Sequence, residues 1–191
     1  MKKILILFFY FMFIFNSQGQ KFNGYVVTNE NDTINCKFFV GTNFIYKKMF
    51  YPSSVKRKVK ILNNKGEKIT YKPFELVSFC INETDRGSYK FVSVQADNYS
   101  DFFHVVVEGK ISLLCTYIQN MDTSEIPREY YYKNNELYET DWFDQRNQFG
   151  LLIKDNKELY EKWMDSNNFF KLRQIPEVIK LYNESLVTKN N

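Results

Sequence analysis

Apolar and polar residues alternate in short runs along most of the chain, from Phe22 to about Thr140. The runs are rich in Val, Ile, Tyr, Phe and Thr, and turn signals such as NEND and GTN separate them. A period of two with such boundaries is typical of half-buried β-strands. About ten short strands at this spacing predict a mainly antiparallel β-sandwich or partly open barrel.

The expected strands outside the basic segment described below are Phe22–Thr28, Thr33–Val40, Phe44–Tyr51, Glu75–Ile81, Ser88–Gln95, Asp101–Val107, Ile111–Ile118, Arg128–Tyr132 and Glu136–Thr140. Glu108-Gly109-Lys110 and Asn134-Asn135 are each short enough to connect neighbouring strands as a tight hairpin.

The segment VKRKVKILNNKGEKITYKP, Val55 to Pro73, is rich in basic residues and contains a single acid, Glu67. We expect a hairpin with the three-residue loop Asn64-Lys65-Gly66. Of loops with two, three or four residues, only the three-residue loop places the apolar residues of both strands on one face, with Ile61 opposite Ile69. It also puts Gly66 where a left-handed residue is needed.

Read as a strand from Val55, this hairpin displays five lysines on one face: Lys56, Lys58, Lys60, Lys68 and Lys72. Two interpretations remain open for them. They are either solvated lysines that keep an edge strand from pairing with other chains, or a binding site for an anionic glycan, lipopolysaccharide phosphate or an acidic protein.

After Thr140 the apolar period becomes helical. Trp142, Phe149, Leu152 and Ile153 can share one face of a first helix, and Asp155 with Glu158 resembles a capping box that opens a second. A last helix begins near Pro176. Its apolar stripe consists of Ile175, Val178, Ile179, Tyr182 and Leu186. The predicted class is therefore α+β, with two or three C-terminal helices packed on the sheet.

The N-terminus has the pattern of a cleaved export signal. Lys2 and Lys3 precede the apolar run Ile4–Phe15, and the small residues Ser17 and Gly19 follow it. The run is shorter than the roughly 20 residues of a spanning helix. We expect cleavage after Gly19, which leaves Gln20 first and not the cysteine of a lipoprotein.

The domain boundaries follow from these patterns. We expect a signal peptide at 1–19, a β-rich body at 20–140, a helical part of the same domain at 141–186 and a disordered tail at 187–191. The predicted localisation is periplasmic or secreted, with no transmembrane span after cleavage.

Composition narrows the possible chemistry. Removing Lys2 and Lys3 lowers the formal net charge from +4 to +2, which is not typical of a nucleic-acid binder. The single histidine, His104, alternates in phase with Phe102 and is expected to be structural. Three cysteines, Cys36, Cys80 and Cys115, allow at most one internal disulfide and show no metal-ligand spacing. No metal, cofactor or phosphate-binding glycine loop is predicted.

Carboxylates are the remaining catalytic option, because two placed acids suffice for glycoside hydrolysis. Glu139, Asp141 and Asp144 lie among aromatic residues that could hold a sugar. The alternative is an ordinary strand pair and helix start, in which acids favour the helix N-terminus. A carbohydrate hydrolase is therefore the second hypothesis, after a non-catalytic envelope-associated binding module. Asp32-Thr33-Ile34 resembles a short O-glycosylation site, or is a plain turn into a strand.

Four sequence features carry a family resemblance: GYVVTNENDTINCKF near the N-terminus, YKPFELVSF in the middle, the hairpin EGKISLL and the ending IPEVIKLYN. With them the chain resembles a family of small exported proteins of unknown function from Flavobacteria and other Bacteroidetes. The resemblance implies export and a β-rich body with terminal helices. It implies no activity, cofactor or functional residue.

Overall fold

The computed structural model describes residues 20–40, 49–96, 99–120, 124–165, 167 and 170–187. The predicted signal peptide and residues 188–191 of the predicted tail lie outside this part of the chain. The strands are β1 (Gln20–Thr28), β2 (Thr33–Val40), β3 (Val59–Leu62), β4 (Lys68–Tyr71), β5 (Leu76–Thr84), β6 (Gly87–Ala96), β7 (Tyr99–Val107), β8 (Ile111–Gln119), β9 (Glu125–Lys133) and β10 (Glu136–Glu139).

The α-helices are α2 (Gln145–Leu152), α3 (Lys157–Met164) and α4 (Ile175–Val187), and short 3-10 turns occur at η1 (Pro52–Val55), η2 (Pro73–Glu75) and η3 (Leu172–Gln174). Helix α4 thus runs through Val187, one residue into the predicted tail. Among the described helices, none combines the length and apolar character that crossing a bilayer requires.

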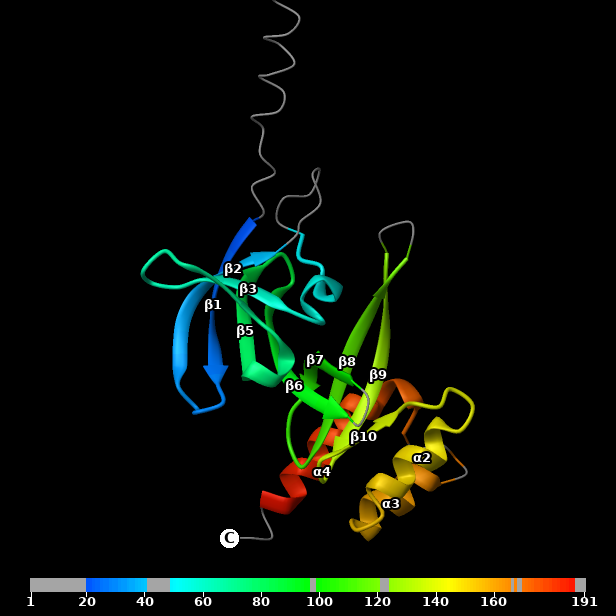
Figure 1. Ribbon diagram of the computed structural model, residues 1–191. Helices are drawn as coiled ribbons and strands as arrows, with labels where there is room; N and C mark the ends of the chain where they lie inside the picture. Colours follow the sequence, from blue (N-terminus) through cyan, green and yellow to red (C-terminus); the bar gives the residue numbers. More distant parts are fainter. Residues whose placement is uncertain are drawn as a thin grey trace, which may run out of the picture.

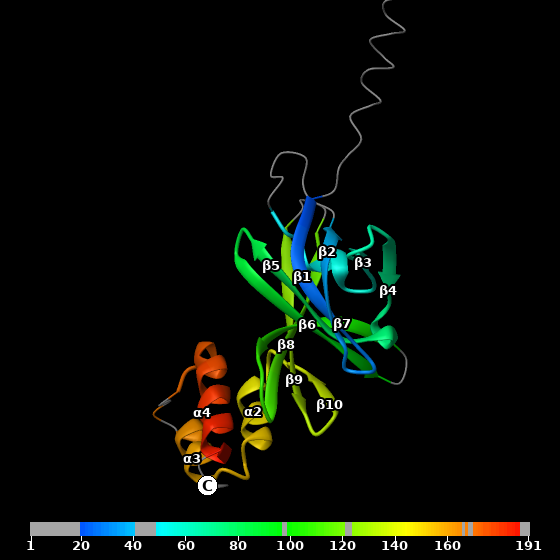
Figure 2. The same cartoon turned by 90° about the vertical axis from the view of Figure 1, so that its left-hand side faces the viewer.

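The ten strands form one antiparallel sheet in the order β10-β9-β8-β7-β6-β5-β1-β2-β3-β4. The predicted α+β class with a partly open, antiparallel sheet is confirmed, and the helices follow the strands in the chain. In Figures 1 and 2 the helices lie at one end of the molecule and β1–β4 at the other. The expected strand Phe44–Tyr51 is wrong at Met49–Tyr51, which are not in a strand, and its remainder lies outside the described residues.

The sheet curls at its β1–β7 end around an aromatic core. Phe79 of β5 stacks on Phe91 of β6 at 4.8 Å between ring centroids, and Phe102 of β7 meets Phe79 edge-on at 4.8 Å. Phe38 of β2 and Ile61 of β3 complete this core from the other side. Alternation along each strand directs these side chains inward, as the period-two pattern predicts.

The helices cover the same face of the sheet at its β8–β10 end. Ile111 and Leu113 of β8 and Tyr131 of β9 pack against Phe149, Trp163 and the buried stripe of α4. The stripe is as predicted: Ile175, Val178, Ile179 and Tyr182 are buried, and Leu186 is partly buried.

Two helix-level predictions are wrong. Trp142 is not on the buried face of a helix but is 87% exposed in the turn before α2, because the helix begins three residues later. The N-cap of α3 is Asn156, whose side chain accepts a hydrogen bond from the Leu159 backbone N–H. Asp155 instead accepts a hydrogen bond from the Tyr182 hydroxyl at 2.7 Å.

The β3–β4 hairpin has the predicted register. Val59 lies opposite Tyr71, Lys60 opposite Thr70 and Ile61 opposite Ile69. Gly66 has φ 81°, the left-handed conformation that the loop requires. The strand, however, begins at Val59 and not at Val55, because Pro52–Val55 forms the turn η1.

Candidate functional site

The outward side of β1–β4 is lysine-rich. Lys21, Lys37, Lys60 and Lys68 come from β1, β2, β3 and β4 respectively, and all four side chains are exposed. We call these four residues the outer lysine face. The pairing aligns them, since Lys21 lies opposite Phe39 and Phe39 opposite Lys60. Two of these lysines, Lys60 and Lys68, were predicted from the sequence, and two were not.

Phe39 forms the centre of the outer lysine face. The Lys21 ammonium lies 5.3 Å and the Lys68 ammonium 5.4 Å from the centroid of its ring. Such contacts hold cations over an aromatic face. No ion pair joins any of the four lysines to an acid within the described part of the chain. Among the described residues, their charge is therefore not neutralised by an ion pair.

Strands β1–β4 contain no Asp or Glu, and, apart from Phe39 and Leu62, the outward strand positions around these lysines are polar. The amides Asn23 and Asn35 and the hydroxyl of Thr70 occupy them. The amides continue into a hollow of about 590 Å³ that is lined by Asn23, Asn35, Lys37, Asn63, Asn64 and Asn82, among others. Donors and acceptors of this kind suit a hydroxylated ligand.

Lys56 does not belong to this face, which corrects the prediction of five lysines on one side. It follows η1, outside the strand, and its ammonium pairs with Asp101 of β7 at 3.3 Å. Lys58, Lys60, Lys68 and Lys72 are exposed. Lys72 follows β4 and lies over the Phe74 ring, with 5.8 Å from its ammonium to the ring centroid.

The position of Lys56 reflects a separation of two neighbouring strands. Strands β7 and β8 pair only from His104 to Val107, although β8 pairs with β9 along its whole length. Where β7 is no longer paired with β8, the Phe102 backbone N–H donates to the Lys56 carbonyl at 2.7 Å. The segment after η1 therefore contacts the β7 backbone at this point.

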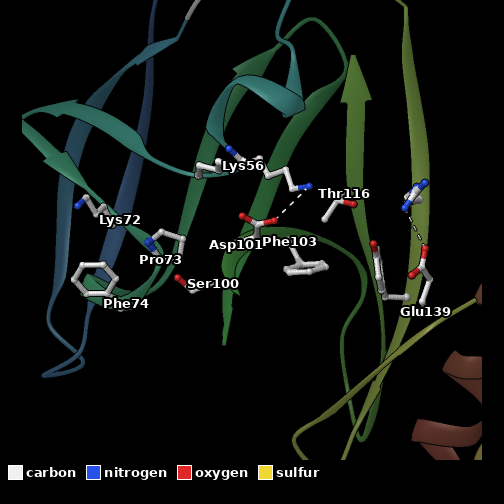
Figure 3. Close-up of a pocket in the computed structure, with 12 residues that line it drawn as sticks. Lys56, Lys72, Pro73, Phe74, Ser100, Asp101, Phe103, Thr116 and Glu139 are labelled. Atoms are coloured by element: carbon white, nitrogen blue, oxygen red, sulfur yellow. Dashed lines mark hydrogen bonds and ion pairs between the residues drawn. The ribbon is translucent and has the colours of Figure 1, made fainter. Parts of the chain in front are cut away.

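A groove of about 580 Å³ lies at this separation (Figure 3). Asp101 and Phe103 come from β7, Thr116 from β8, Arg128 and Tyr130 from β9, and Glu139 from β10. Lys56, Arg57, Lys72, Pro73, Phe74 and Ser100 complete its lining. In Figure 3 the Lys72 and Phe74 side chains lie on one side and Glu139 on the other, with Asp101 and Phe103 between them.

The three acids of the hydrolase hypothesis do not share this groove. Glu139 lines it and pairs with Arg128 at 3.3 Å. Asp141 accepts a hydrogen bond from the Phe143 backbone N–H, and Asp144 accepts one from the Asn147 amide. Both of these acids are exposed in or beside the turn before α2 and are not part of the groove lining. The structure therefore does not bring the three carboxylates around one cleft.

The thiols and the histidine lie in the protein interior. Cys36, Cys80 and Cys115 are all buried and not disulfide-bonded. Burial raises the pKa of Cys36 and of Cys115 to about 11, which disfavours the reactive thiolate. His104 is half-buried as predicted, its Nδ1 lies 2.8 Å from the Tyr117 hydroxyl, and burial lowers its pKa to about 4. The described residues contain no cluster of three or more potential metal ligands of the His, Cys, Asp or Glu type.

The sequence did not single out Lys21, Lys37 or the groove residues Asp101, Phe103, Thr116 and Arg128. A signal for Lys37 existed, because it lies between buried Cys36 and Phe38 on a predicted strand, whereas Lys21 precedes the predicted strand Phe22–Thr28 by one residue. The comparisons add no further residue: no family model matches the chain, and no curated protein or solved structure is significantly similar to it.

Proposed function

We propose that the protein is an exported, non-catalytic module that binds an anionic glycan of the cell envelope through the outer lysine face. The observation that carries the proposal is the set of four unpaired lysines on four adjacent strands, without a carboxylate at the outward positions between them. Uncompensated cations on one surface attract a polyanion, and the attraction weakens as salt is added.

A glycan suits this surface better than other anionic partners. In the hollow beside Lys37, Asn23 and Asn63 already donate to Glu83 and Glu67, but Asn35 and Asn64 supply amide groups for sugar hydroxyls. Phe39 supplies a ring among the cations. Lipopolysaccharide phosphate and an acidic protein are the other partners that the sequence left open. Export rests on the signal-like pattern of residues 1–19 and on the family resemblance. We do not propose the hydrolase, because its three carboxylates lie around no common groove.

The test measures binding of residues 20–191 to immobilised polygalacturonate across a salt series, with neutral dextran as the comparison. One variant replaces Lys21, Lys37, Lys60 and Lys68 with Gln. The matched control makes the same change at four exposed lysines elsewhere: Lys110, Lys154, Lys171 and Lys180. Both variants lose the same formal charge, so only position differs between them.

We expect salt-sensitive binding to polygalacturonate that weakens about tenfold or more in the first variant and far less in the control. Equal weakening in both variants would mean that net charge alone acts and would overturn the proposed face. Binding to vesicles that contain lipid A phosphates or to an acidic protein, but not to the glycan, would replace the proposed ligand class.

A further inference from the structure

We propose that the groove at the separation of β7 and β8 is a second, independent ligand site, which takes a small sugar acid. A sugar acid combines one carboxylate with several hydroxyl groups, and the groove offers partners for both. It shares no residue with the outer lysine face, so the two proposals can fail separately.

The cations of the groove fall into two kinds. Lys56 and Arg128 are already paired, with Asp101 and Glu139 respectively. Arg57 and Lys72 line the same groove and form no ion pair with a described acid. A guanidinium binds a carboxylate with two parallel hydrogen bonds. The two unpaired cations therefore fit the one or two carboxylates of a small sugar acid.

The hydroxyl partners lie deeper in the groove. Thr116 is 3% exposed, and its Oγ1 has no hydrogen-bond partner. An unsatisfied buried hydroxyl is uncommon and costs about 1 to 3 kcal/mol. Asp101 is also buried, with a side chain 12% exposed, and its ion pair with Lys56 runs through Oδ2. Figure 3 shows the Lys56 side chain extending toward both Asp101 and Thr116. Because this oxygen is itself shielded from solvent, a ligand hydroxyl that enters beside Lys56 would supply the missing partner once the Thr116 side chain turns toward the groove.

Aromatic side chains provide the apolar surface that a sugar ring needs. Phe103 and Tyr130 are buried neighbours whose rings meet edge-on at 5.2 Å. Phe74 is 51% exposed at the rim, beside Lys72. The volume of about 580 Å³ is within the range of small-molecule sites, roughly 300 to 1,000 Å³. The groove is thus sized for one or two sugar units and not for a long polymer.

The experiment titrates the protein with digalacturonate and, as the neutral comparison, with the corresponding disaccharide of galactose, by calorimetry and by amide chemical shifts. Arg57→Gln removes an exposed cation of the groove. Thr116→Val removes only the unpartnered hydroxyl. Arg173→Gln, at an exposed arginine that belongs to neither proposed site, is the matched control.

We expect digalacturonate to bind at least tenfold more tightly than the neutral sugar, with shifts at Asp101 and Thr116. Arg57→Gln should weaken binding about tenfold and Thr116→Val about fivefold, while Arg173→Gln leaves it unchanged. Thr116→Val should also keep or raise the melting temperature, because it removes an unsatisfied buried group. Equal affinity for the acid and the neutral sugar, no binding of either, or wild-type affinity in both groove variants would overturn the proposal.

Discussion

At the β1–β7 end, the sheet bends around its own side chains, so Phe79 stacks on Phe91 and meets Phe102 edge-on. At the β8–β10 end, three helices bring Phe149, Trp163 and the α4 stripe to cover the strand residues. The two ends join where β7 and β8 pair over only a few residues. The groove lies between the end of the sheet that packs on its own side chains and the end that the helices cover. The strand separation therefore has a structural cause, whatever ligand occupies it.

The largest expected effects come from removing one aromatic from each core. Phe79→Ala and Trp163→Ala delete fully buried rings and should each lower the free energy of unfolding by about 3 to 5 kcal/mol. Trp163 also donates a hydrogen bond from Nε1 to the Arg146 carbonyl at 2.8 Å, which the substitution removes. Urea unfolding measures both changes.

The Phe79→Ala variant also tests whether the two ends unfold as one unit. Both tryptophans, Trp142 and Trp163, lie in the helical end, whereas far-UV circular dichroism reports the strands as well. Because one continuous sheet joins the ends, the two signals should shift together to lower urea. A fluorescence transition that stays in place while the dichroism transition moves would make the ends separate folding units.

A smaller loss is expected from Gly24→Ala, which acts on the β1–β7 end alone. A Cβ at Gly24 would lie 2.0 Å from the Cys80 carbonyl oxygen of the neighbouring strand β5. Strand β1 must shift away from β5, at a cost of about 1 to 3 kcal/mol or more.

Gly66→Ala is the comparison for Gly24→Ala in thermal unfolding. At Gly66 an added Cβ meets nothing within 4 Å, and only its φ of 81° is unfavourable for alanine. Its cost should stay near 1 kcal/mol. A larger loss for Gly66→Ala than for Gly24→Ala would contradict the close approach of β1 and β5.

Local patterns in the sequence predicted much of the fold. Ile61 and Ile69 share a face only with a three-residue loop, so the β3–β4 register followed from the chain alone. Asn134 and Asn135 both have positive φ, as their tight hairpin requires. Trp142 was assigned wrongly because a helical period cannot show where the helix starts. In each case the information lay within a few neighbouring residues.

The candidate sites were predicted less well, because they depend on contacts between distant segments. Lys56 was assigned to the strand face, but η1 and Asp101 turn its side chain toward the groove. The groove joins residues from four different strands and the segments around β3 and β4. Nothing in the local pattern of Thr116 or Arg57 indicates that β7 and β8 separate beside them. Such a site becomes visible only once the pairing of the strands is known.

The two ends of the molecule should lose stability at different pH values when acid is added. Burial lowers the pKa of His104 from 6.5 to about 4, so the folded protein holds it neutral while the unfolded chain protonates. The stability that the folded protein has with a neutral His104 is fully present above pH 6.5 and is lost as the pH falls toward 4. At about pH 4.5 the free energy of unfolding is lower by roughly 2 kcal/mol. At the helical end, burial opposes ionisation of Asp155, but the Tyr182 hydroxyl and Lys133 outweigh it and lower its pKa.

The ionised Asp155 therefore stabilises the folded protein above pH 3.8, its ordinary pKa, and this stabilisation is lost only at lower pH. Urea unfolding from pH 7 to 4.5 should show a smaller loss of stability in His104→Gln than in the wild type. Asp155→Asn should follow the wild-type slope over this range, although its stability is lower throughout. Equal slopes for His104→Gln and the wild type would mean that His104 is protonated in the folded protein. The curled end would then have no acid response of its own, and the contrast between the two ends would rest on packing alone.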